Sequence, residues 1–247
     1  MQNQPSSPPK PVTEWWRPDL VALPRLTLAR RFFRDLTRRI LKLLVFFTMR
    51  ATVSGVENFP RRGPAIIVVN HLGDADVALF GASMPLSIDA IAKIESLEHW
   101  LVGPVFRAYG MIFIHRGRPD RRALRAALDG LAQGRIIALA PEGRQSLIGG
   151  LEEGTEGAAF LAMKSGAPIT PVALTGTQNE YIYGRKWWER VPVTLRMGKP
   201  FFLQKQVQGQ EVMRDEATRQ IMEAIASLLP ESYRGNYRFD QAEEQAN

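Results

Sequence analysis

The feature that most constrains the fold is an alternation of short apolar runs with helical patterns, which begins after residue 50. Apolar runs rich in β-branched residues predict buried strands, and apolar residues three and four apart predict amphipathic helices. We expect strands at 52–56, 65–69, 88–92, 111–114, 136–140, 169–174 and 193–197, and helices at 74–82, 121–131, 155–165 and 211–229. This order favours an α/β fold, with a mostly parallel mixed sheet flanked by helices.

Residues 19–50 form a separate segment in front of this pattern. Between Leu26 and Phe47 apolar residues recur at helical spacing, and six cations stand among them against one acid, Asp35. A basic amphipathic helix of this kind binds membrane interfaces, although a helix that packs on the domain and leaves its charges in water has the same pattern. We therefore divide the chain into a disordered leader (1–18), an amphipathic helical membrane-binding segment (19–50), an α/β domain (51–235) and a polar tail (236–247).

The composition narrows the chemistry. The chain has no cysteine, which excludes disulfides, zinc–thiolate sites, iron–sulfur clusters and a thiol nucleophile. Lysine and arginine number 32 against 25 acidic residues, and this excess favours an anionic partner such as nucleic acid, a membrane surface or a phosphorylated substrate. No apolar run approaches the roughly 20 residues of a membrane-spanning helix, and the N-terminus does not resemble a signal peptide.

The stretch VVNHLGDADVALF, residues 68–80, carries the first candidate site. His71 directly follows a predicted buried strand, and Asp74 and Asp76 stand within five residues of it. Three interpretations are open: a metal site held by the two aspartates, a helix start with Asp74 near its N-terminus, or a catalytic pair. The pair requires His71 in the turn and Asp76 in the first turns of the helix, since a spacing of five puts side chains roughly 140° apart on a regular helix. Asp76 would then orient the imidazole, and the free ring nitrogen would act as a base.

Three more segments follow in order, and each stands at or beside a predicted strand. They are GMIFIHR at 110–116, APEGRQS at 140–146 and GAPITPV at 166–172. Together with HLGDAD they resemble the four sequence blocks of the glycerolipid acyltransferase superfamily, which includes 1-acylglycerol-3-phosphate and glycerol-3-phosphate acyltransferases. The third block is usually F-P-E-G-T-R-S, so this chain departs from it at Ala140, Arg144 and Gln145.

The resemblance implies acyl transfer from a thioester to a hydroxyl, with His71 as general base and Asp76 as its orienting partner. It implies no cofactor and no metal; acyl-CoA or acyl carrier protein serves as co-substrate. Arg116 corresponds to the family's phosphate-binding arginine, and Arg144 stands beside the position of a second one. The expected substrate-binding residues are Lys93, Arg116, Glu142, Gly143, Arg144 and Ser146.

The acceptor that the resemblance favours is a lysophospholipid, 1-acyl-glycerol 3-phosphate, which would give phosphatidic acid. The alternative acceptors are another lysolipid and glycerol 3-phosphate. The alternative functions are a metal-dependent transferase that uses Asp74 and Asp76, and an inactive family member that only binds lipid. No helix-turn-helix, zinc-finger or RNA-binding signature supports a nucleic-acid partner, and no G-x-S-x-G supports a serine hydrolase. We expect a peripheral, monotopic protein on the cytoplasmic face of an anionic membrane.

Overall fold

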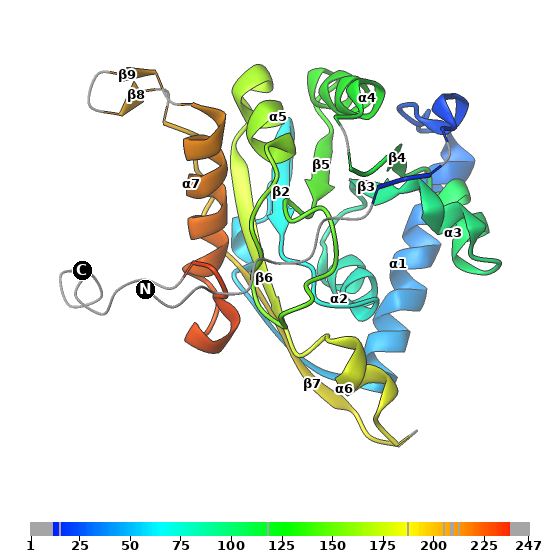
Figure 1. Cartoon of the computed structure of the whole chain (residues 1–247). Helices are drawn as coiled ribbons and strands as arrows, with labels where there is room; N and C mark the ends of the chain where they lie inside the picture. Colours follow the sequence, from blue (N-terminus) through cyan, green and yellow to red (C-terminus); the bar gives the residue numbers. More distant parts are fainter. Residues whose placement is uncertain are drawn as a thin grey trace.

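Seven strands form one sheet in the order β1-β7-β6-β2-β5-β3-β4 in the computed structural model (Figure 1). The structure describes residues 12–237 except 15, 118, 187, 205, 208, 209 and 212, and it describes only the backbone of 206, 207, 210 and 211. The strands are β1 (Met49–Ser54), β2 (Ala65–Val69), β3 (Asp89–Lys93), β4 (Ile112–Ile114), β5 (Ile136–Leu139), β6 (Ile169–Thr175) and β7 (Val191–Met197). All neighbouring strands are parallel except β6 and β7. The predicted mostly parallel, mixed sheet is therefore confirmed.

Helices cover both faces of this sheet. The α-helices are α1 (Leu28–Thr48), α2 (Ala75–Ser83), α3 (Val102–Tyr109), α4 (Arg121–Ala132), α5 (Gly157–Ser165), α6 (Asn179–Tyr183) and α7 (Arg214–Ala226). The chain also contains a two-stranded pair, β8 (Gln206–Val207) with β9 (Gln210–Glu211), and short 3-10 turns, which are η1 (Pro18–Leu20), η2 (Val56–Asn58), η3 (Ile94–Glu98) and η4 (Glu231–Tyr233). The sequence pattern did not predict α3 or α6, because both are short.

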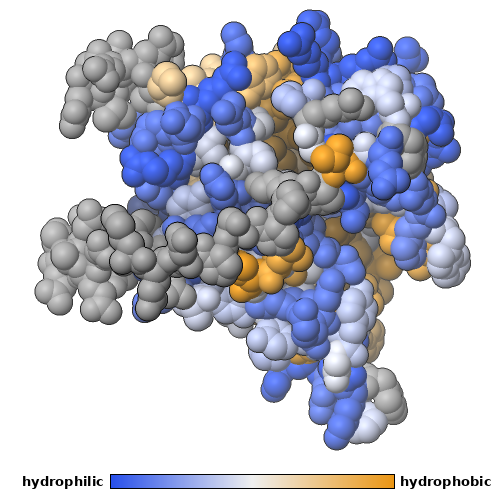
Figure 2. Space-filling model, viewed as in Figure 1, coloured by the Kyte–Doolittle hydropathy of each residue, from blue (hydrophilic) through white to orange (hydrophobic). Residues whose placement is uncertain are grey.

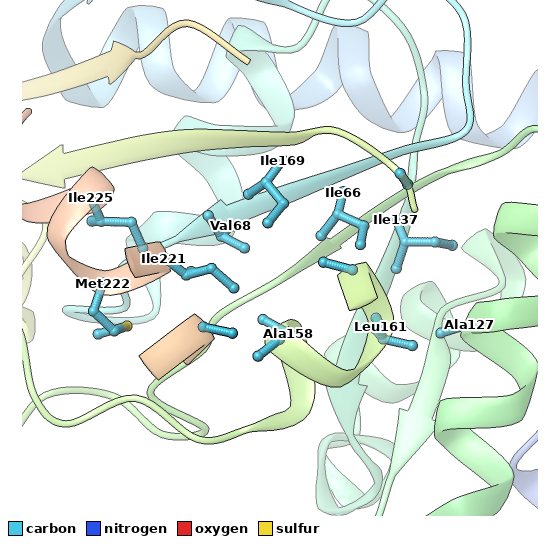
Figure 3. Packing of buried hydrophobic residues seen from close by; sticks show 14 of the residues in the cluster. Ile66, Val68, Ala127, Ile137, Ala158, Leu161, Ile169, Ile221, Met222 and Ile225 are labelled. Atoms are coloured by element: carbon cyan, nitrogen blue, oxygen red, sulfur yellow. The ribbon is translucent and has the colours of Figure 1, made fainter. Parts of the chain in front are cut away.

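Strand β2 shows how the sequence fills two cores. Its side chains alternate, so that Ile66 and Val68 pack among residues of α4, α5 and α7 (Figure 3). Ala65 and Ile67 pack on the opposite face, among residues of α1 and α2. A strand buried on both faces is apolar throughout, which explains the uninterrupted run AIIVV.

The N-terminal segment differs from the prediction at the start of its helix and in the part of the leader around Thr13. Helix α1 begins at Leu28 because the Thr27 side chain caps it by accepting from the Arg30 N–H at 3.2 Å. Residues 1–11 and Trp15 of the expected leader lie outside the described residues. Thr13 is buried, its N–H donates to the Arg116 carbonyl at 3.1 Å, and its hydroxyl accepts from the Arg116 N–H at 2.8 Å. The prediction of disorder is therefore wrong for this part, because its partner lies about a hundred residues away and leaves no local signal.

Helix α1 turns part of its basic side toward the domain. Arg34 is 3% exposed and donates to the Asp89 carboxylate at 2.7 Å. Arg30 donates to the Ala108 carbonyl at 3.3 Å, and Arg38 donates to the Pro85 carbonyl. These three arginines are therefore held by hydrogen bonds to the domain, so this part of the basic side packs on the protein.

The side of α1 that faces away from the domain is apolar, and we call it the apolar stripe. Its side chains are 42–85% exposed, and they are Leu28, Phe32, Leu36, Ile40, Leu43, Leu44, Phe46 and Phe47. Orange atoms appear along the flank of the molecule where α1 lies (Figure 2). Within the described part of the chain, no helix combines the length and the apolar character needed to cross a bilayer.

The sheet brings the expected site residues to one edge. Strands β6, β2, β5, β3 and β4 run parallel, so their carboxyl ends meet at the same edge, where ligands of α/β proteins usually bind. His71 follows β2, Glu142 follows β5, Lys93 ends β3 and Arg116 follows β4. The fold thus collects segments that are far apart in the sequence.

Candidate active site

His71 and Asp76 form a close pair at the carboxyl end of β2. His71 lies in the turn after the strand, and Asp76 lies in the first turn of α2. The His71 Nδ1 atom is 2.6 Å from Asp76 Oδ2, and the side chains are 28% and 7% exposed. The turn makes possible a contact that a regular helix would forbid at this spacing.

The hydrogen bonds of Asp76 define the tautomer of His71. Oδ2 also accepts the N–H groups of Leu72 at 2.6 Å and Gly73 at 3.1 Å. An oxygen that accepts these two donors acts as an acceptor toward His71 as well, so Nδ1 carries the proton. In the neutral form of the half-buried imidazole, Nε2 is then the nitrogen without a proton, which is the one that can act as a base.

The loop after β5 holds the backbone of His71 from both sides. The His71 N–H donates to Glu142 Oε1 at 2.8 Å, and the Ser146 N–H donates to the His71 carbonyl at 2.7 Å. Glu142 is fully buried and accepts the Glu152 N–H on Oε2 at 2.7 Å. The APEGRQS segment therefore fixes the position of the histidine.

Burial controls the proton affinity of Glu142. Desolvation raises its pKa to about 8, and the charges of Glu152 and Asp76 act in the same direction. The N–H groups of Glu152 and His71 oppose this shift without cancelling it. The carboxyl group that braces His71 thus favours its protonated form well above the ordinary pH range of a glutamate.

Arg144 lies inside this loop. Its side chain is 5% exposed, and its Nε donates to Glu152 Oε2 at 2.7 Å. Glu152 also accepts the Leu147 N–H at 2.7 Å. The guanidinium that the sequence led us to expect at an acceptor thus pairs with a buried carboxylate in the described structure.

Gly143 and Ser146 shape the same loop. Gly143 has φ +72°, a left-handed conformation that favours glycine, and its N–H donates to the Ala140 carbonyl at 3.1 Å. The Ser146 hydroxyl donates to the Gly150 carbonyl at 2.5 Å. Both residues therefore make contacts that close the turn.

Arg116 and Lys93 lie toward the other end of the sheet edge. Three strand spacings separate β4 from β2, which is about 14 Å. Arg116 is partly buried, and its Nη2 is 3.3 Å from Glu95 Oε1, whereas Lys93 is exposed. Burial would raise the pKa of Glu95, but its backbone hydrogen bond, the Thr13 hydroxyl and Arg116 together lower it. Arg116 and Lys93 thus lie where β3 and β4 end, at one end of the sheet edge that carries His71.

Asp74 connects three segments at the rim of the site. Gln145 Nε2 donates to its Oδ1 at 2.7 Å, the Tyr183 hydroxyl donates to its Oδ2 at 3.0 Å, and its N–H donates to Asn179 Oδ1 at 2.9 Å. The sequence did not point to Asn179 or Tyr183, which lie on the unpredicted helix α6 more than a hundred residues away. Gln145, which stands where the resembled family has an arginine, thus hydrogen-bonds to an acid beside the His71–Asp76 pair.

A second histidine–aspartate pair has the same spacing. His115 Nδ1 is 2.7 Å from Asp120 Oδ2, and both side chains are 0% exposed. The Arg17 N–H donates to His115 Nε2 at 2.9 Å, and the Trp16 ring stacks on the imidazole at 4.1 Å between centroids. Both nitrogens of His115 are therefore occupied, in contrast to those of His71.

The two aspartates of the first stretch make separate contacts. Asp76 turns Oδ2 toward His71, while Asp74 turns both oxygens toward Gln145 and Tyr183. In the described ranges of the chain, no three His, Asp or Glu side chains are grouped as metal ligands would be.

The buried Glu142 predicts a pH dependence of stability. The folded protein holds the proton up to about pH 8, whereas the unfolded chain releases it near pH 4.5, so stability falls as pH rises between these values. The free energy of unfolding from this group alone should drop by up to about 5 kcal/mol. Denaturant titrations near pH 5 and above pH 8 would measure the drop.

Glu142→Gln should remove most of the slope of the free energy of unfolding against pH. The variant also loses one of the two N–H hydrogen bonds that Glu142 accepts from His71 and Glu152, because an amide nitrogen cannot accept. Glu57→Gln, at an exposed position, is the matched control and should keep the slope of the wild type. An unchanged slope in Glu142→Gln would show that Glu142 is ionised in the folded protein throughout this range.

Comparison with known proteins identifies related sequences and a related structure. The acyltransferase family model matches residues 50–175. A 1-acyl-sn-glycerol-3-phosphate acyltransferase of Borreliella burgdorferi is 31% identical over 137 residues, which cover 54% of this chain and 54% of that protein. The human 1-acyl-sn-glycerol-3-phosphate acyltransferase beta is 26% identical over 155 residues, with 62% and 56% covered. This chain spans about half the length of these curated relatives.

A solved structure shares the fold over most of the chain. The crystal structure of the 1-acyl-sn-glycerophosphate acyltransferase PlsC from Thermotoga maritima superposes with a TM-score of 0.60 at 25% identity. The superposition covers 82% of this chain and 84% of that one. The similarity thus extends beyond the residues that the family model matches.

Proposed function

Because the chain belongs to the acyltransferase family that includes the 1-acyl-sn-glycerol-3-phosphate acyltransferases, we propose that it moves an acyl group from a thioester to the hydroxyl of a lysophospholipid. The donor is acyl-CoA or acyl carrier protein. The acceptor is 1-acyl-glycerol 3-phosphate, and the product is phosphatidic acid. The observation that carries this proposal is the His71–Asp76 contact of 2.6 Å at the carboxyl edge of the sheet.

The proposed reaction uses His71 as the only proton carrier. Nε2 removes the proton from the acceptor hydroxyl while its oxygen attacks the thioester carbonyl carbon. The new C–O bond forms, the C–S bond breaks, and the proton passes from Nε2 to the departing thiolate. Asp76 stabilises the imidazolium that exists between these two transfers.

In this proposal, Arg116 and Lys93 bind the acceptor's phosphate. Arginine forms paired hydrogen bonds with phosphate oxygens, and the Nε of Arg116 is buried with no hydrogen-bond partner among the described residues. A phosphate would compete with Glu95 for the same guanidinium. Glu142, Gly143, Arg144 and Ser146 support the reaction indirectly, by holding the loop that fixes His71.

We further propose that α1 places the protein on a membrane as a monotopic protein. Its apolar stripe is exposed along the length of the helix, and such a contiguous apolar surface usually marks an interaction site. An apolar face of this kind lies at the boundary between head groups and acyl chains, where a lysophospholipid would be found. We propose the cytoplasmic face of the membrane, because the protein would meet its proposed donors, acyl-CoA or acyl carrier protein, on that side.

Product mass spectrometry on purified protein in anionic lipid tests the reaction. We expect acyl-CoA or acyl carrier protein with 1-acyl-glycerol 3-phosphate to give phosphatidic acid, and EDTA to leave the rate unchanged. Arg116→Ala should raise the KM for this acceptor about tenfold or more, because a charge-assisted contact is lost. The KM of the Arg116→Ala variant for monoacylglycerol, which has no phosphate, should be the same as that of the wild type.

Arg125→Ala is the matched control, since Arg125 is exposed on α4. Failure to acylate any acceptor would overturn the proposed activity. Products from phosphate-free acceptors alone would overturn the acceptor but keep the chemistry. A loss of activity with EDTA would favour the metal-dependent alternative that uses Asp74 and Asp76.

A further inference from the structure

The end of α6 and the connection from it to β7 carry exposed side chains that the proposed reaction does not use. Tyr181 and Trp188 are 56% and 62% exposed. Cations alternate with them in the sequence, at Arg185, Lys186 and Arg190. We call residues 181–190 the aromatic–basic loop; within it, Trp187 lies outside the described residues.

The aromatic–basic loop lies directly beside the C-terminal end of α1. Arg190 donates through Nε and Nη2 to the Met49 carbonyl at 2.9 and 2.6 Å. Its guanidinium lies 5.3 Å from the centre of the Phe46 ring. Because β1 and β7 are parallel and pair from Met49 and Val191 onward, this contact is built into the sheet (Figure 1). The loop thus continues the apolar stripe, which ends at Phe46 and Phe47.

The chemistry of the loop matches the head-group layer of a bilayer. An open groove of about 960 Å³ runs beside it, lined among others by Arg50, Arg185 and Arg190. With Lys186 there are four cations in this region against two acids, Glu180 and Glu189. Exposed tryptophan and tyrosine favour the interface between water and acyl chains, and nearby cations attract anionic lipids.

We propose that the aromatic–basic loop is a second membrane-binding element, which binds the head groups of an anionic bilayer next to the apolar stripe of α1. This extends the membrane placement of α1 proposed above. An acidic carrier protein would also match the charges, but it would not account for aromatic side chains that continue an apolar stripe.

The loop is also connected to the catalytic pair. At its base, α6 contacts the start of α2 through Asn179 and Tyr183, whose side chains hydrogen-bond to Asp74 at 2.9 and 3.0 Å. A bilayer bound by the loop would therefore lie near the residues that hold the start of the catalytic helix. A lipid acceptor would then have a short path to His71.

Vesicle co-sedimentation of the full chain without substrates tests this proposal. Arg185→Glu/Lys186→Glu should bind at least about 25-fold more weakly than the wild type to vesicles of equal parts phosphatidylglycerol and phosphatidylcholine, since each lost cation near the surface contributed about fivefold and each added carboxylate is repelled by the anionic lipid. The same variant should bind pure phosphatidylcholine like the wild type. Trp188→Ala should bind both compositions about threefold to tenfold more weakly, because its contribution is mainly apolar.

Two controls match these changes at positions away from α1 and the loop. Phe202→Ala removes another exposed aromatic, and Lys164→Glu reverses an exposed charge on α5. Both should bind vesicles like the wild type. Acyl transfer in detergent micelles should also be the same in the loop variants and the wild type, which shows that they are folded.

Unchanged vesicle binding in both loop variants would overturn the proposal. If the loop variants with unchanged vesicle binding also transfer acyl groups more slowly from acyl carrier protein, but not from acyl-CoA, the loop binds the carrier protein instead. An inactive wild type would overturn the proposed acyl transfer and leave the binding result intact, so the two failures are distinguishable.

Discussion

Replacing His71 by alanine is expected to lower the rate of acyl transfer about a thousandfold or more, because the only proposed base is removed. The fold should survive the change. The Asp76 carboxylate keeps its N–H donors from Leu72 and Gly73, so the free energy of unfolding should change by about 1 kcal/mol or less. Turnover of acyl-CoA, measured beside denaturant unfolding of the same preparation, checks both values.

The chain supplies its own control in His115, which has the same spacing to an aspartate. His115→Ala removes a side chain that is 0% exposed, and it leaves the partly buried Arg17 N–H without its acceptor. We expect a loss of about 3 kcal/mol in stability, mainly because Asp120 loses its buried partner, and a turnover per folded molecule within about tenfold of the wild type. A His71→Ala protein that acylates as fast as the wild type would refute the catalytic pair.

Asp76→Asn should also lower turnover strongly, by roughly a hundredfold to ten-thousandfold, while the fold is retained. The amide oxygen can keep the three contacts that Oδ2 makes with His71, Leu72 and Gly73. The amide NH₂ would then take the place of Oδ1, which is buried and without a partner among the described residues. The variant thus removes the negative charge that stabilises the imidazolium and leaves the geometry close to that of the wild type.

Asp74→Asn is the matched control at the same helix start. Asp74 binds Gln145 and Tyr183, not His71, so its loss should change turnover by about tenfold at most. Steady-state kinetics of both variants, with and without EDTA, separate the alternatives. An equal and severe loss in both variants, together with EDTA sensitivity, would indicate a metal held by the two aspartates.

The strands and the longer helices could be predicted because their signals are local. Each of the seven predicted strands overlaps an observed one, and the run AIIVV of β2 is buried as expected. Helices α3 and α6 were missed, since an eight-residue and a five-residue helix carry too little periodicity. The sequence left three interpretations of HLGDAD open, and a contact between His71 and Asp76 required His71 in the turn and Asp76 in the first turns of the helix. The structure has this arrangement.

The orientation of α1 could not be predicted. Its sequence is basic on one side and apolar on the other, and either side could have faced the domain. Arg34 faces inward because Asp89 and the carbonyl groups of Tyr109 and Gly110 hold its guanidinium. The partner Asp89 lies 55 residues away and belongs to a strand of the sheet.

The sequence by itself determined the order of strands and helices, the family resemblance and the residues that carry the proposed chemistry, because these depend on patterns within short segments. Only the tertiary structure decided which of the two His-x4-Asp pairs is accessible and which is capped by Arg17 and Trp16. It also decided that Glu142 braces the His71 backbone from 71 residues away and that Arg144 pairs with Glu152. Burial and long-range hydrogen bonds arise only when the sheet brings these segments to one edge, and a linear sequence carries no direct record of them.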